Sequence, residues 1–425
     1  MKRISFLWLS PVLTAFGKRF GIDSHYYAKN GAFVVVGHAV TIVRGFVTGY
    51  IVARFFDQEV YGQYQFMLSV LGTFSVFALS GMSHSVTRAW ARDDAFSLWG
   101  VIKPQLSVSL IVSVALLASI PFLGRFGREE FTSMFVAAAL LFPLAPTAMV
   151  RYGGYTVGKS RFDLALEVTT VSSVLMILIT GLIIAFNQSA LLMLIAAMAV
   201  TPLVQFAYSR GIKPPEAAGK PDNTKGIVRY AWQLTFATLP SDLVWYLDKL
   251  LISYFFGLNQ LALFSVALLI PEQAKVFAKQ FFPITFAKQA ANSDSKARRA
   301  HLVKIIVIGT VIFAVGIAAY VAVCPWIMPF LFPGYDPYQL TLLSGIAALT
   351  LVTIPSTLLT QYLEARGMIT EVRRSTWIAT ALFAASLFAF VPSMGPLGAV
   401  IARGVFRFAN AGTALWYVLR APIKT

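Results

Sequence analysis

The chain has little of the chemistry on which most enzymes and metalloproteins depend. Cysteine occurs once, at Cys324, and histidine four times among 425 residues. A single cysteine cannot form an intrachain disulfide, and we interpret it as a small apolar filler. The sequence contains no GxxxxGKS/T or HExxH motif and no histidine or cysteine cluster with metal-ligand spacing. We therefore predict no cofactor, no bound metal and no enzymatic activity.

Acidic side chains are also scarce, and so is charge of either sign. The sequence has 18 Asp and Glu against 35 Lys and Arg, a formal net charge of +17, yet only 12% of its residues are charged. Hydrophobic residues make up 57%, and the mean hydropathy is +0.71. Such values exclude a soluble protein of this length and indicate a polytopic membrane protein.

Long apolar runs recur along the whole sequence and determine the predicted fold class. Each run is long enough to cross about 30 Å of hydrocarbon as an α-helix. We predict an all-α polytopic membrane protein with about 12 transmembrane helices, at 30–54, 63–83, 100–123, 131–151, 163–186, 189–209, 227–256, 261–283, 302–324, 337–363, 371–391 and 396–419.

The basic residues are distributed unevenly among the connections, and this predicts the orientation. If both termini are cytoplasmic, the inner segments hold 28 of the 35 Lys and Arg, and the outer loops hold only Arg54, Arg125 and Arg128. Short cytoplasmic loops retain positive charge, whereas translocated loops lose it. The positive charge is thus explained by topology, and we predict no nucleic-acid partner.

Two segments outside the spans divide the chain into domains. Residues 1–29 lack a signal-peptide pattern, and we predict a cytoplasmic or interfacial segment on the inner leaflet, with a basic tail as the alternative. The Pro-, Gly- and Lys-rich segment 210–226 is typical of a linker. A weak repeat, ARFFDQEVYGQYQF from Ala53 and SYFFGLNQLALFSV from Ser253, favours two related halves. We predict six-helix lobes at 30–209 and 227–419, a cytoplasmic linker at 210–226 and a cytoplasmic tail at 420–425.

Arg44 lies midway along the first predicted span. An arginine near the bilayer centre costs about 2.5 to 3.5 kcal/mol on insertion scales, so it must face protein, water or ligand. Thr41, Arg44 and Thr48 share one helical stripe, and no acid of the first half is predicted at this depth. The guanidinium could be satisfied by backbone carbonyls, by Asp242 or Asp248 of the other half, or by an anion, whose phosphate oxygens it matches well. We favour the anion.

The second half carries a denser set of ionisable residues within its spans. Asp242, Trp245 and Lys249 share one stripe, and Asp248 lies beside it. Glu272 and Lys275 follow Pro271 in the next span. Arg403 and Arg407 lie one turn apart in the last span. They could form a self-neutralising network or line a cationic path. We predict substrate binding by Arg44, Arg403, Arg407, Lys249 and Lys275, ion coupling or charge pairing by Asp242, Asp248 and Glu272, and a polar or aromatic lining at Thr41, Thr48 and Trp245.

Several passages resemble one family of bacterial membrane proteins. They are ARFFDQEVYGQY around Gly62, YLDKLLISYFFG from Tyr246, FFPITFAKQA from Phe281 and GPLGAVIARGV from Gly395. In their order and spacing, the chain resembles polysaccharide transporters of the O-antigen flippase type. Their superfamily also contains multidrug exporters and flippases of lipid-linked peptidoglycan precursors. The repeat has Ala262 where the first half has Gly62, which departs from the family's pattern.

The resemblance implies two six-helix bundles around a central cavity that opens alternately to the two sides of the bacterial inner membrane. It implies an undecaprenyl-pyrophosphate-linked oligosaccharide as substrate, moved to the outer leaflet for O-antigen (lipopolysaccharide) or exopolysaccharide assembly. Membrane lipids, H⁺ or Na⁺ and a polysaccharide polymerase are the further candidate partners. The two rival functions are a multidrug exporter of the same fold and a membrane-embedded polymerase or ligase. The excess of basic residues within the spans counts against the first, and the short outer loops against the second.

Overall fold

The computed structural model describes residues 24–125, 131–212, 222–279, 295–365 and 368–420. Regular secondary structure in these residues is helical, and no strand occurs among them. The predicted all-α polytopic class is therefore confirmed. Residues 1–23, 213–221 and 421–425 lie outside the described residues, so the predictions for the N-terminal segment, the linker and the tail stay predictions there.

The first half is a succession of helices with short connections. They are α2 (Ser24–Phe55), α3 (Gln58–Ser75), α4 (Gly81–Ala91), α5 (Leu98–Ala118), α6 (Ile120–Arg125), α7 (Thr132–Leu141), α8 (Leu144–Ala148), the π-helical η3 (Met149–Gly153), α9 (Gly154–Gly158), α10 (Phe162–Phe186) and α11 (Ala190–Ser209). Serine side chains cap two of them. Ser97 accepts a hydrogen bond from Gly100 N at 3.1 Å at the start of α5, and Ser189 accepts one from Leu192 N at 3.4 Å at the start of α11.

The second half contains the longest helices. They are α12 (Thr224–Ala267), α13 (Leu269–Lys279), α15 (Ser295–Leu331), α16 (Pro337–Leu349), the 3₁₀ segment η4 (Thr350–Ser356), α17 (Thr357–Ala365), α18 (Ile369–Met394) and α19 (Pro396–Arg420). Gly257 interrupts α12, because its φ of +83° is not helical. This left-handed value favours glycine, and the chain changes direction there.

Nine segments of the described residues are long and apolar enough to cross a membrane. Eight correspond one to one with predicted spans, and the ninth, Trp245–Ala267, overlaps the predicted spans 227–256 and 261–283. Predicted spans 63–83 and 396–419 are helical, but the first is divided between α3 and α4, and the second carries Arg403 and Arg407. The exact number of twelve therefore stays a prediction.

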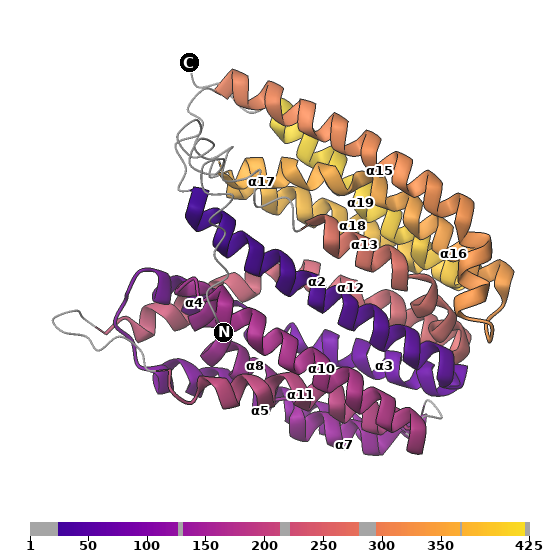
Figure 1. Cartoon of the computed structure of the whole chain (residues 1–425), viewed down its shortest axis with the longest axis horizontal. Helices are drawn as coiled ribbons and strands as arrows, with labels where there is room; N and C mark the ends of the chain where they lie inside the picture. The colour runs from indigo at the N-terminus through magenta and orange to yellow at the C-terminus, as the bar shows by residue number, and fades with distance from the viewer. Residues whose placement is uncertain (1–23, 126–130, 213–221, 280–294, 366–367, 421–425) are drawn as a thin grey trace.

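The helices of the two halves gather in two groups. Figure 1 shows α4, α5, α7, α8, α10 and α11 in one group, α15 to α19 in the other, and α2, α12 and α13 running between them. The largest buried apolar cluster contains residues of both halves, among them Met67 of α3, Phe264 of α12 and Phe383 of α18. The groups thus share a core around α3 and α12.

The contact between α3 and α12 depends on a glycine. A Cβ atom built on Gly62 would lie 2.2 Å from the backbone oxygen of Leu258. Only a residue without a side chain allows the two backbones to approach this closely. This is the position singled out by the family resemblance, and the structure gives it a packing role.

A second contact joins the halves where α2 ends and α3 begins. The Arg54 guanidinium donates hydrogen bonds to the carbonyls of Phe330 and Leu331 at 3.1 and 2.9 Å. The Gln58 amide donates to the Gly334 carbonyl just beyond α15. In the predicted orientation this is the outer end of the molecule, so these bonds connect the halves on the outer side.

Candidate functional site

A cavity of about 580 Å³ lies between α3, α12, α13 and α19. Its size is within the range of small-molecule sites. Six of the predicted site residues contribute to its lining: Asp242, Trp245, Lys249, Glu272, Lys275 and Arg403. Tyr61, Gln65, Tyr246 and Gln273 are among its other polar or aromatic lining residues. The structure thus brings together residues of four helices that are far apart in the sequence.

Ion pairs connect most of the charged residues of this cavity. Arg403 donates to Asp248 at 2.5 Å through Nε and to Glu272 at 2.9 Å through Nη1. Arg407 donates to the same Glu272 oxygen at 3.0 Å, and Lys275 pairs with the other oxygen of Glu272. Asp248 is completely buried and the Arg403 side chain is 8% exposed. The charge pairing considered from the sequence is present for these five residues, which we call the Glu272 network.

Lys249 lies beside the Glu272 network without an ion pair. Its Nζ donates to Gln65 Oε1 at 3.0 Å, while its backbone N–H donates to the Asp248 carboxylate at 2.7 Å. No carboxylate among the described residues lies within 4 Å of its amino group. The Glu272 network and Lys249 together contain four basic groups and two carboxylates. Asp242, which also lines the cavity, reduces this excess of positive charge to one.

Trp245 forms one wall of the cavity and packs on an aromatic group. Its ring centre lies 5.0 Å from that of Phe406 and 6.3 Å from that of Phe383. The Lys275 amino group lies 4.9 Å above the ring, and the Arg403 guanidinium carbon lies 5.8 Å from its centre. Such cation–π contacts favour charged groups at this apolar surface. Trp245 therefore contacts both the aromatic core and the basic groups of the cavity.

The predicted polar stripe of the first span lies elsewhere. Arg44 does not contribute to the lining described above, and its Nη1 donates to the Thr201 hydroxyl of α11 at 3.4 Å. No carboxylate among the described residues forms an ion pair with it. Thr41 donates back to the Gly37 carbonyl of its own helix. The Thr48 hydroxyl is buried and has no hydrogen-bond partner in the part of the chain that the structure describes.

Sequence reasoning missed the neutral partners of the basic groups. Gln65 accepts from Lys249, Thr350 accepts from Arg407, and Thr201 accepts from Arg44. A glutamine at position 65 within an apolar run is a signal that could have been used, because buried amides need partners. Thr350 and Thr201 carry no comparable signal, since threonine is common in apolar helices and bonds to its own backbone.

A family model described as polysaccharide biosynthesis protein matches residues 27–271, which is more than half of the chain. The chain belongs to this family. The matched region contains most of α2, the helices from α3 to α12 and the beginning of α13, and therefore Arg44, Asp242, Trp245, Asp248 and Lys249. Among curated proteins, none matches the chain.

Solved structures of the superfamily predicted from the sequence share the fold of this family member. An inward-facing multidrug resistance MATE transporter of the MOP superfamily is 16% identical, covering 90% of this chain and 94% of its own, with a TM-score of 0.68. The lipid II flippase MurJ in an inward closed conformation is 13% identical, covering 92% and 88%, with a TM-score of 0.70. A MOP superfamily transporter from Pyrococcus furiosus, described as having a binding pocket of reverse polarity, is 16% identical, covering 93% and 95%, with a TM-score of 0.63.

Proposed function

We propose that this polysaccharide biosynthesis protein is a flippase for undecaprenyl-pyrophosphate-linked oligosaccharides. It would move these units from the inner to the outer leaflet of the bacterial cytoplasmic membrane for surface polysaccharide assembly, with both of its termini in the cytoplasm. The observation that carries the proposal is the excess of basic groups in and next to the cavity. Lys249, Lys275 and Arg403 line it, Arg407 pairs with Glu272 from outside the lining, and three carboxylates, Asp242, Asp248 and Glu272, oppose these four bases. An anionic headgroup would complete this charge balance.

The physics of the substrate explains why such a cavity is needed. Each polar group that enters hydrocarbon without a hydrogen-bond partner costs several kcal/mol, and a charged group costs far more. A pyrophosphate with attached sugars would lose many partners during unassisted crossing. Lysine and arginine donors replace water at the pyrophosphate oxygens, and Trp245 offers a flat apolar surface to a sugar ring. The lipid tail can stay in the bilayer.

The carboxylates have two proposed roles in this function. Glu272 accepts from Lys275, Arg403 and Arg407, and Asp248 accepts from Arg403. While no anion is bound, these pairs lower the free energy that is needed to keep the basic groups away from water. Asp242, Asp248 and Glu272 are also the candidate sites for a coupling H⁺ or Na⁺, since binding of either would release basic side chains toward the substrate. Alternating access would follow from movement of the two groups of helices.

Transport by the purified protein tests the function directly. Proteoliposomes would contain a polyprenyl-pyrophosphate-linked disaccharide with a fluorescent label on the sugar, and external dithionite would destroy the label of the outer leaflet only. We expect the protein to expose the protected inner pool, so that nearly all fluorescence is lost. A labelled phosphatidylcholine is the control lipid and should stay protected.

Two outcomes of this assay would overturn the proposal. One is protection of the inner pool equal to that in protein-free vesicles. The other is transport of an organic cation such as ethidium by the same vesicles with no movement of the labelled saccharide lipid, which would assign the protein to the multidrug exporters.

A further inference from the structure

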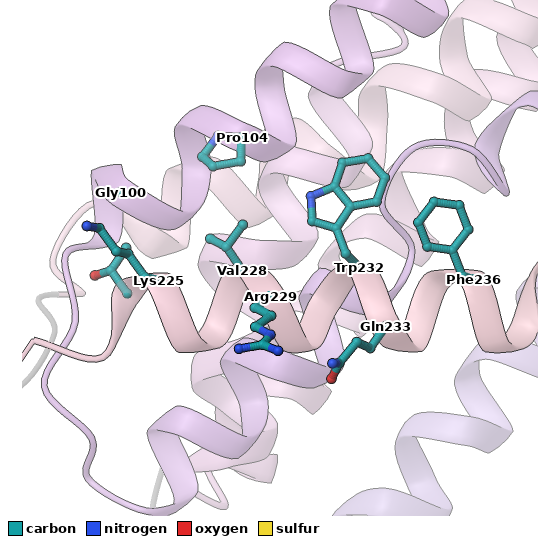
Figure 2. A pocket seen from close by; sticks show the side chains of 9 residues that line it. Gly100, Pro104, Lys225, Val228, Arg229, Trp232, Gln233 and Phe236 are labelled. Carbon is teal, nitrogen blue, oxygen red and sulfur yellow. The ribbon is translucent and has the colours of Figure 1, made fainter.

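A second cavity, of about 670 Å³, lies nearer the start of α12 than the first and is open to the surface. Figure 2 shows it between the beginning of α5, with Gly100 and Pro104, and the first part of α12, from Lys225 to Phe236. The α12 residues of this groove are Thr224, Lys225, Val228, Arg229, Trp232, Gln233 and Phe236. We call it the α5–α12 groove.

Hydrogen bonds fix the closed end of the α5–α12 groove. Ser97 N donates to Thr224 Oγ1 at 2.9 Å, and Asn223 N donates to the Ala95 carbonyl at 2.9 Å. Gly100 lets the helices meet, because a Cβ atom there would lie 2.6 Å from Thr224 Cγ2. The two helix starts are therefore tied together, and the groove opens beyond them.

The first turns of α12 have two different faces. Ile227, Ala231 and Thr235 are buried, and Thr235 accepts a hydrogen bond from Gly81 N at 2.9 Å. On the groove face, Lys225, Arg229, Trp232 and Phe236 follow one another at helical spacings of four, three and four residues. The α5–α12 groove is thus lined by an ordered stripe, basic at the start of the helix and aromatic farther along.

The aromatic end of this stripe is exposed although it is apolar. Trp232 and Phe236 stack at 5.6 Å with an angle of 23° between their rings, and they remain 37% and 63% exposed. Phe236 lies 11 residues after Lys225, or about 16 Å along the helix axis. In the predicted orientation α12 enters the membrane from the cytoplasm, so the basic end lies at the headgroups and the aromatic end at the acyl chains.

The basic end of the α5–α12 groove has charge available for a ligand. No ion pair of the described residues includes Lys225 or Arg229. Both side chains are exposed at the helix start. The nearby Asp222 is engaged with Thr224, whose N–H and hydroxyl both donate to its carboxylate. These hydrogen bonds hold the pKa of Asp222 below its usual range, so this carboxylate stays ionised and directed at Thr224.

The geometry points to the α5–α12 groove as a binding site for an anionic phospholipid of the inner leaflet. Lys225 and Arg229 contact the headgroup phosphate, and one acyl chain lies along Pro104, Trp232 and Phe236. A soluble phosphate compound would leave the aromatic half of the groove uncovered. A zwitterionic phospholipid also carries a phosphate, but its headgroup cation would lie beside the two basic side chains and weaken the contact. The site is distinct from the central cavity, with which it shares no lining residue.

Quenching of tryptophan fluorescence by brominated lipids tests the inference. The full-length protein would be placed in phosphatidylethanolamine vesicles with increasing fractions of phosphatidylglycerol brominated on its acyl chains. Subtracting the fluorescence of Trp232→Phe from that of the wild type gives the fluorescence of Trp232 without that of the other seven tryptophans. We expect this signal to be quenched at low fractions of brominated phosphatidylglycerol, and not by brominated phosphatidylcholine at the same fractions.

Charge-matched variants distinguish lipid binding in the α5–α12 groove from the general attraction of basic residues to an anionic membrane. Each basic residue near an anionic surface strengthens lipid binding about fivefold. The Lys225→Ala/Arg229→Ala variant should therefore need an about 25-fold higher fraction of brominated phosphatidylglycerol for the same quenching of Trp232. Arg373→Ala/Arg374→Ala removes the same charge from exposed positions of α18 and should change nothing. Inorganic phosphate should not relieve the quenching.

Four outcomes would overturn the inference. Equal quenching by phosphatidylcholine would mean ordinary boundary lipid, and an unchanged Lys225→Ala/Arg229→Ala variant would exclude a role for the two bases. Displacement by inorganic phosphate would indicate a soluble ligand, and a Trp232 signal that no brominated lipid quenches would mean that protein covers the groove.

Discussion

At the scale of single residues, the pairing of Asp248 with Arg403 is the best-defined feature of the site. Asp248 is completely buried, and its carboxylate accepts from Arg403 Nε at 2.5 Å. Breaking a buried pair leaves an uncompensated charge, which typically costs about 3–5 kcal/mol. We expect Asp248→Ala to lower the apparent Tm of the detergent-solubilised protein strongly.

The double variant Asp248→Leu/Arg403→Met is the matched control for this pair. Apolar side chains of similar size often replace a buried ion pair without loss of stability. We expect the Tm to recover while flipping stays low, because the proposed function needs the basic group. A single variant as stable as the wild type would contradict the buried pairing, and full transport by the double variant would exclude Arg403 from substrate binding.

Arg44 has a different environment, since its side chain donates a hydrogen bond to the Thr201 hydroxyl at 3.4 Å. A hydrogen bond to a charged group contributes about 1.5–3 kcal/mol, so loss of a substrate contact here predicts at least a tenfold slower flipping rate for Arg44→Ala. Thr201→Val removes only the observed acceptor and should retain most of the rate. If Arg44→Ala flips at the wild-type rate with normal abundance, Arg44 does not contribute to the path.

The charged residues of the site could be predicted from the sequence, but their partners could not. Lys249, Glu272 and Arg403 are recognisable because ionisable groups are costly within apolar runs. Arg403 and Asp248 are 155 residues apart, and no local spacing indicates that they meet. Arg44 shows the same limit. Its stripe is evident from the sequence, but the direction in which the stripe faces depends on how α2 packs against α10 and α13.

At the scale of elements, the contact of α3 with α12 depends on Gly62. An added methyl group would overlap the Leu258 carbonyl, and overpacking of this kind costs about 1–3 kcal/mol. Replacement of a helical glycine by alanine otherwise stabilises by up to about 1 kcal/mol. We therefore expect Gly62→Ala to lower the Tm, whereas Gly181→Ala, which meets no atom within 4 Å, should leave it unchanged or raise it.

Equal melting temperatures of Gly62→Ala and Gly181→Ala would contradict this expectation. In that case the approach of α3 to α12 could widen freely, and the shared core would not depend on this glycine.

Element boundaries were predictable where a span is uniformly apolar and less so where it is interrupted. The predicted helix 371–391 is α18, Ile369–Met394, and the predicted helix 163–186 is α10, Phe162–Phe186. The predicted span 63–83 is divided because the chain turns between α3 and α4, where Leu79 has a positive φ. Hydropathy does not detect such a turn, since the residues on both sides of it are apolar.

At the scale of the whole molecule, the orientation in the membrane can be checked with single cysteines. Cys324 is buried and would be replaced by serine to provide a background. Arg92 is exposed in the connection between α4 and α5, and Gln339 is exposed in the first turn of α16, at the opposite predicted side. We expect a membrane-impermeant thiol reagent to label Gln339→Cys in intact cells and Arg92→Cys only after the membrane is opened. The reverse pattern would invert the predicted topology.

The overall class follows from composition alone, because 57% hydrophobic residues and a mean hydropathy of +0.71 require a membrane as solvent. The helices gather in two groups, with α2, α12 and α13 between them, and the division into two six-helix lobes stays a prediction (Figure 1). The shape of the cavity was not predictable, because it depends on how four helices from both halves pack.

The most direct measurement of the central claim is binding of a pyrophosphate headgroup at the cationic cavity. Calorimetric titration of the solubilised protein would compare a polyprenyl-pyrophosphate-linked disaccharide with the same disaccharide on a neutral polyprenyl ether. We predict clear binding of the first only. Lys249→Gln and Lys275→Gln should each weaken it at least about tenfold, while Arg373→Gln/Arg374→Gln should not. Equal affinity for the neutral lipid, or unchanged affinity in both lysine variants, would contradict the account.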